Sequence, residues 1–111
     1  MKTSSAKAKG RRLAQLVKDT LLQWAPDLKQ DDIVVTSSGT TGEDIQLSPA
    51  ARAIYNYAIE CKNVEKLNVW DAYAQACTHV KDDRTPVLVF CRNRAKPMVA
   101  ISLDDFLKLT R

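Results

Sequence analysis

A short, almost unbroken run of apolar residues constrains the fold of this chain most strongly. Residues 86–91 read Pro-Val-Leu-Val-Phe-Cys, and a run of this length and composition is typical of a strand buried in the interior. Residues 98–102 are also mostly apolar and follow after a polar turn, so we expect a second strand there. The sequence therefore predicts a sheet whose central part is shielded from solvent.

Two segments have the spacing of amphipathic helices, and a third has a helix start signal. Residues 10–24 place Leu13, Leu16, Val17, Leu21 and Trp24 on one stripe, and Ala25-Pro26 ends it. Residues 67–80 are expected to form the next helix, with an apolar face made of Leu67, Trp70, Tyr73, Ala74 and Cys77. On this interpretation Trp70 belongs to the core. A closing helix is expected to begin at Ser102 and to run to Leu109.

Composition indicates one ordinary domain with a basic beginning. The chain has 111 residues, 45% hydrophobic content and a formal charge of +4, so it needs no disulfide to build a core. Its first twelve residues contain five positive charges and no acid. This asymmetry favours a polyanionic partner. We expect residues 1–9 to be a flexible basic arm, or simply a solvated tail, and residues 10–111 to be the folded domain.

Cysteine usage and hydropathy bear on the compartment. The three cysteines at positions 61, 77 and 91 form no Cys-x-x-Cys pair, and their odd number favours reduced thiols in a cytoplasm. No stretch reaches the roughly 20 apolar residues that a membrane span requires, and no signal peptide is recognisable. The sequence therefore predicts a cytoplasmic protein without a membrane partner.

The triplet Glu60-Cys61-Lys62 ends a predicted strand over residues 57–62. Alternate residues of a strand project from the same face, so Glu60 and Lys62 would emerge together while Cys61 turns toward the core. If residues 44–47 form an adjacent strand, Asp44 and Glu60 can share a Mg²⁺ ion with the backbone carbonyl of Cys61. Lys62 would then lie beside the attacking water. The alternative interpretation of the triplet is a solvated strand end.

Several motifs in this order resemble the PD-(D/E)xK nuclease superfamily, and in particular its small phage and archaeal Holliday-junction-resolvase-like endonucleases. The motifs are Gly42-x-Asp44-Ile45, Ile59-Glu60-Cys61-Lys62-Asn63, Trp70 with Gln75-Ala76, and residues 86–94 with Pro97. The resemblance implies an α/β fold with a central mixed sheet flanked by helices, in the order α-β-β-β-α-β. It also implies hydrolysis of DNA with Mg²⁺ or Mn²⁺ as cofactor. A bacterial, archaeal or phage-infected host cell would be the setting.

One departure from this family concerns the first helix. Members of the branch often begin with Lys-Gly-x-x-Phe-Glu, in which the Glu joins the metal site. Here the segment Lys9-Gly10-Arg11-Arg12-Leu13-Ala14 places Ala14 at that position. Either Gln15 or Glu43 substitutes for the missing carboxylate, or the metal is held by fewer protein ligands.

The resemblance also implies further site residues and partners. It places Gln75 toward the active site, against the alternative of a solvent-facing helical glutamine. Contacts to DNA phosphates are expected from basic or small polar side chains, namely Lys9, Arg11, Arg12, Ser38, Arg52, Arg92, Arg94 and Lys96. A junction resolvase would act on branched or duplex DNA as a two-fold homodimer. The alternatives are a nicking or homing-type endonuclease, and a non-catalytic DNA-binding module on a nuclease fold.

Overall fold

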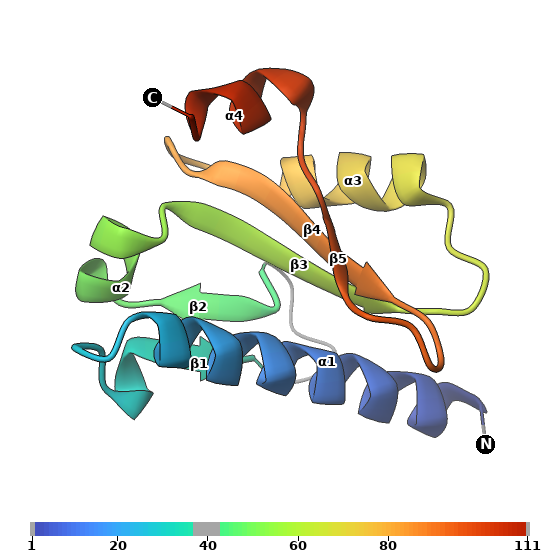
Figure 1. The fold of residues 1–111 in the computed structure, drawn as a ribbon. Helices are drawn as coiled ribbons and strands as arrows, with labels where there is room; N and C mark the ends of the chain where they lie inside the picture. Colours follow the sequence, from blue (N-terminus) through green and yellow to red (C-terminus); the bar gives the residue numbers. More distant parts are fainter. Residues whose placement is uncertain (1, 37–42, 111) are drawn as a thin grey trace.

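The apolar run predicted to be buried is the central strand of a three-stranded mixed sheet (Figure 1). A computed structural model describes residues 2–36 and 43–110, with side chains from residue 6 onward. β4 (Thr85–Cys91) pairs in parallel with β3 (Tyr57–Asn63) and antiparallel with β5 (Met98–Ala100). The helices are α1 (Lys2–Trp24), α2 (Pro49–Ile54), α3 (Val69–Thr78) and α4 (Leu103–Lys108). The chain is therefore an α/β protein, as expected.

The two preceding strands form a separate antiparallel pair. β1 (Ile33–Val35) pairs with β2 (Ile45–Leu47), and a 3₁₀ turn over Gln30–Asp32 leads into β1. The order of the elements is as predicted for α1, β1, β2, β3, α3 and β4. The strands form two sheets, however, and not the one central sheet that was expected. The backbone hydrogen bonds between strands do not continue from β2 to β3. At this edge the Cys61 N–H donates to the side chain of Asp44 and not to a backbone carbonyl.

The first helix begins at Lys2, eight residues earlier than predicted, so it includes residues 2–9 of the segment expected to be a flexible basic arm. Residues 6–9 read Ala-Lys-Ala-Lys and are good helix formers, so one glycine at position 10 is tolerated. Leu13 and Ala14 point into the core. Among the described residues no helix is both long and apolar enough to cross a membrane.

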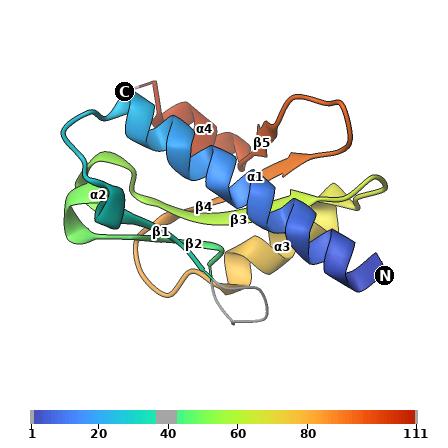
Figure 2. The ribbon, with the colours of Figure 1, turned by 90° about the horizontal axis from the view of Figure 1, so that it is seen from below.

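The orientation predicted for the third helix was also wrong. The side chain of Trp70 is 86% exposed, whereas Ala72 and Ala76 are buried against the sheet. Small residues let a helix lie close to its neighbour, so the alanine stripe fits against the sheet, whereas an indole would hold the helix away. Of the predicted stripe, Trp70, Ala74 and Cys77 are exposed, whereas Leu67 and Tyr73 are partly buried. The helices α1 and α3 cover opposite faces of the sheet (Figure 2). The buried residues of α1 are Leu13 and Ala14, whereas those of α3 are Ala72 and Ala76.

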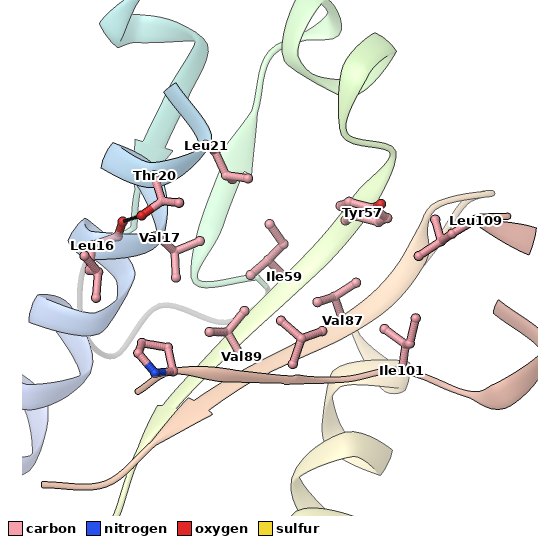
Figure 3. A pocket seen from close by; sticks show the side chains of 12 residues that line it. Leu16, Val17, Thr20, Leu21, Tyr57, Ile59, Val87, Val89, Ile101 and Leu109 are labelled. Carbon is pink, nitrogen blue, oxygen red and sulfur yellow. Dashed lines mark hydrogen bonds between the residues drawn. The ribbon is translucent and has the colours of Figure 1, made fainter. Parts of the chain in front are cut away.

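The core lies mainly between α1 and the sheet, and it is open along one side. A groove of about 570 Å³ separates α1 from β5 and from the end of α4. Figure 3 shows Val17 and Leu21 of α1 on one side of it, and Ile59 and Val87 of the sheet on its floor. The groove is almost wholly apolar, and it lies on the face of the sheet opposite to that of Glu60.

Serine side chains cap the starts of α2 and α4, and the start at Ser102 is as predicted. The hydroxyl of Ser48 accepts a hydrogen bond from the Ala51 N–H, and Pro49 occupies the first helical position of α2. The hydroxyl of Ser102 likewise accepts from the Asp105 N–H at the start of α4. These local caps fix where the chain leaves β2 and β5.

Candidate active site

Asp44 is attached to β3 by its backbone and by its side chain. The Asp44 N–H donates to the carbonyl of Ile59 at 3.3 Å, and the Cys61 N–H donates to Asp44 Oδ2 at 2.7 Å. The Asp44 carbonyl in turn accepts from the backbone N–H and the hydroxyl of Thr36. These bonds hold the carboxylate at the edge of β3, directly beside the Glu60-Cys61 peptide. The predicted adjacency of Asp44 to the triplet is therefore confirmed.

The backbone carbonyl of Cys61 lies on the same edge of β3. The N–H and C=O of one strand residue point to the same side, and residues two apart share that side. Since the Cys61 N–H and the Ile59 carbonyl both face Asp44, the Cys61 carbonyl is directed toward this edge as well. The Cys61 side chain points into the core under α1, as predicted. Burial, followed by the charges of Asp44 and Glu60, raises the pKa of the Cys61 thiol, which keeps it neutral.

Glu60 is a carboxylate inside the protein. Among the described residues it is the one charged residue that is buried, with 5% of its surface exposed. Burial, and then the nearby charge of Asp44, raises the pKa of Glu60, while a contact with His79 and the charge of Lys62 act in the opposite direction. A buried carboxylate beside a second negative charge forms a place where a cation is favoured.

His79, which the sequence analysis did not assign to the site, contacts Glu60 directly. Its Nδ1 lies 2.8 Å from Glu60 Oε1, although 19 residues separate them in sequence. His79 is the residue that ends α3, immediately beyond the alanine stripe. The spacing of Ala72, Ala76 and His79, at i, i+4 and i+7, is the signal that could have placed this imidazole on the inward face of the helix.

The other two predicted catalytic residues differ in their placement. Lys62 lies two residues beyond Glu60 on β3 and is half-buried, so its ammonium shares the face of the carboxylate. Gln75 is exposed, and its backbone carbonyl accepts a hydrogen bond from the Thr78 hydroxyl. The solvent-facing alternative is therefore correct for Gln75, and His79 is the α3 residue that reaches Glu60.

Among the described side chains, Gln15 and Glu43, the two candidates for a third metal ligand, are bonded to other residues. Ala14 is buried in the apolar core, and the exposed Gln15 donates to Asp19 on its own helix. Glu43 precedes Asp44 but is bound by Arg84, whose guanidinium also contacts Asp82. Desolvation lowers the pKa of Arg84, but its hydrogen bonds to these two carboxylates outweigh that effect and raise it. Arg84 thus anchors the segment that leads into Asp44.

The basic residues predicted to contact DNA gather at one end of the molecule. Figures 1 and 2 place the first half of α1 and the turn after β4 at the end where β3 finishes. Asn63, at the end of β3, donates to the backbone carbonyl of Lys9 and so links α1 to the sheet. The exposed residues here are Arg11, Arg12, Arg92, Arg94 and Lys96, with Lys9 partly buried.

One predicted DNA contact, Arg52, is not part of this basic end. Arg52 lies on α2 and forms an ion pair with Asp82 at 3.0 Å, so its charge already has a partner. Ser38 lies outside the described residues. The surface of positive charge is therefore made by α1 and by the turn at 92–97, in which Arg94 has a positive φ of 63°.

The site offers a divalent cation few protein ligands. Within residues 2–36 and 43–110 no group of three or more His, Cys, Asp and Glu side chains is arranged to hold a metal. The Asp44 carboxylate and the Cys61 carbonyl lie at this edge, and the Glu60 carboxylate is near enough to feel the charge of Asp44, so the available donors are all oxygen. Oxygen donors in small number suit Mg²⁺, which keeps several waters of its own. The residues present therefore fit a magnesium ion better than a zinc ion.

Comparisons with protein-family models, with curated proteins and with solved structures found no match to this chain.

Proposed function

We propose that this protein is a metal-dependent DNA endonuclease of the PD-(D/E)xK type, acting on branched or duplex DNA. The observation that carries the proposal is the meeting of Asp44 with the Glu60-Cys61 peptide. Asp44 accepts a hydrogen bond from the Cys61 N–H, its charge acts on the neighbouring Glu60 carboxylate, and Lys62 follows on the face of Glu60. Stability does not require a buried carboxylate of this kind.

Each residue has a distinct role in this proposal. Asp44 and Glu60, with the Cys61 carbonyl, bind Mg²⁺ or Mn²⁺. The bound ion supplies a water of lowered pKa and offsets charge on the phosphate. Lys62 donates hydrogen bonds to the attacking water and to a phosphate oxygen, as a mobile ammonium can. The products expected from the resemblance are a 3′-hydroxyl and a 5′-phosphate.

Removal of either carboxylate tests the chemistry. Asp44→Asn and Glu60→Gln keep the size of each side chain and an oxygen that accepts a hydrogen bond. We expect both variants to lose cleavage by a factor on the order of 10³ while still binding DNA. Asp71→Asn, an exposed carboxylate on α3, is the matched control and should cut normally. Plasmid cleavage with Mg²⁺ or Mn²⁺, run beside a gel-shift assay, decides this; full cleavage by either site variant contradicts the proposal.

The basic end is proposed to bind the DNA backbone. Neutralising Arg92, Arg94 and Lys96 together should weaken binding to all sequences alike. Three lost phosphate contacts should reduce the slope of log affinity against log salt by about 2.7 for duplex DNA. The control is Arg52→Gln, because Arg52 is already paired with Asp82. An unchanged slope in the triple variant would mean that the turn is a solvated loop.

A two-fold homodimer is proposed for junction cleavage, since paired incisions require two sites. The C-terminal elements offer a suitable surface, because β5 is an edge strand and apolar side chains are exposed on β5 and α4. They are Met98, Val99, Leu103, Phe106 and Leu107. Sedimentation should give about twice the 12.4 kDa of one chain. Symmetric cuts in a four-way junction support a resolvase, single nicks in any duplex support a nicking enzyme, and metal-independent binding without cuts supports a non-catalytic module.

A further inference from the structure

The buried carboxylate of Glu60 is in contact with the one histidine of the chain. Glu60 Oε1 lies 2.8 Å from His79 Nδ1, and the side chains are 7% and 24% exposed. An ionised carboxylate can only accept a hydrogen bond, so with Glu60 ionised the Nδ1–H donates to Oε1. The contact therefore determines which of the two Glu60 oxygens turns toward α3.

The position of the imidazole is itself fixed by the fold. His79 ends α3, and its backbone N–H donates to the carbonyl of Ala76 at 3.2 Å. Ala76 is 1% exposed and packs against the sheet, as does Ala72 one turn earlier. The last turn of α3 is thus held at a constant distance from β3. An imidazole on this turn can support a carboxylate more rigidly than a long, flexible side chain could.

We propose that His79 is a positioning residue, whose Nδ1–H holds Oε1 of Glu60 so that Oε2 binds the divalent cation together with Asp44. This inference rests on the proposed function. Carboxylates that bind metals are commonly fixed by such a hydrogen bond, and its loss typically weakens metal affinity 10–100-fold. The need for it is greater here because Ala14 contributes no carboxylate from α1. With two acidic ligands, a freely rotating Glu60 would leave the ion poorly held.

The choice of nitrogen makes the inference testable with conservative variants. The amide nitrogen of an asparagine stands at the same number of bonds from Cα as Nδ1, whereas that of a glutamine corresponds to Nε2. His79→Asn should therefore retain the bond to Glu60, while His79→Gln and His79→Ala should lose it. Cys77→Ser, an exposed position on the same turn, is the control.

Mn²⁺ binding without DNA is the first measurement, made by the electron paramagnetic resonance signal of the free ion. We expect His79→Ala and His79→Gln to bind Mn²⁺ about 10–100-fold more weakly than the parent. His79→Asn and Cys77→Ser should stay within about threefold of it. The Mn²⁺ concentration needed for half-maximal cleavage should rise in the variants that bind Mn²⁺ more weakly. The DNA affinity measured without metal should be unchanged in all of them. A merely structural role for His79 would not separate the Asn variant from the Gln variant.

The failure of this inference is distinguishable from failure of the proposed function. If the parent cuts DNA and His79→Ala binds Mn²⁺ as the parent does, the positioning role is wrong and the nuclease stands. Equal loss in the Asn and Gln variants also overturns it. If His79→Ala does not fold, as judged by circular dichroism, the Asn and Gln pair decides. A parent that neither binds Mn²⁺ nor cuts DNA overturns the nuclease and this inference together.

Discussion

The two faces of β3 are built on opposite principles. Under α1, Ile59 and Cys61 join a continuous apolar core, and Leu13 closes it from the helix. Under α3, the same strand presents Glu60 and Lys62 to a helix lined with alanine. Burial of apolar surface stabilises the first face, whereas the second contains a carboxylate whose burial costs free energy. The comparison indicates that the α1 face stabilises the fold, whereas the α3 face carries the groups on which the proposed activity depends.

Truncation of the α1 face should give the largest change in stability. Leu13 is 2% exposed, so Leu13→Ala removes buried methyl groups and leaves a cavity. We expect the free energy of unfolding to fall by about 3 kcal/mol, measured by urea denaturation. Leu16→Ala on the same helix is the control and should cost much less, because Leu16 is already 48% exposed. A variant of Leu13 that is as stable as the parent would contradict the assignment of the core.

The ion pair of Arg84 should rank second. Its side chain is 10% exposed and that of Glu43 is 16% exposed, so Arg84→Met leaves a largely buried carboxylate without its partner. We expect a loss of about 2 kcal/mol, with thermal unfolding as the measurement. Arg52→Met is the matched control because Arg52 pairs with Asp82 at an exposed position, where ion pairs contribute little. Equal losses in the two variants would show that burial does not increase the contribution of these ion pairs to stability.

Glu60→Gln should change stability in the other direction. The pKa of Glu60 is raised above 4.5, so its contribution favours folding below pH 4.5 and is lost as the pH rises through the folded-state pKa. At pH 7 the variant should therefore be more stable than the parent, by about 1 kcal/mol or about 4 °C in Tm. The difference should vanish at low pH, and Mn²⁺ should stabilise only the parent. A variant less stable than the parent at pH 7 would mean that the Glu60 carboxylate stabilises the folded state.

Local signals in the sequence predicted the elements, whereas contacts between distant segments were predicted less well. The strands expected at 57–62 and 86–91 and the helix start at Ser102 depend on neighbouring residues, and the structure has them within one residue of the expected bounds. The pairing of Glu60 with His79 joins a strand to a helix end, and the helical spacing of His79 indicates only that it faces inward, not which residue it contacts. Asp44 beside Glu60 was predicted because the motif spacing resembles a family in which these residues meet.

The orientation of α3 could not be read from hydrophobicity, and Trp70 tests this point with the smallest effect. A buried tryptophan costs roughly 3–5 kcal/mol when truncated. Because the indole is 86% exposed, Trp70→Ser should instead change the free energy of unfolding by less than about 0.5 kcal/mol. Ala76→Leu, on the inward face of the same helix, should cost about 2 kcal/mol by overpacking against the sheet. The reverse order of these two effects would return Trp70 to the core, rotate α3 and separate His79 from Glu60.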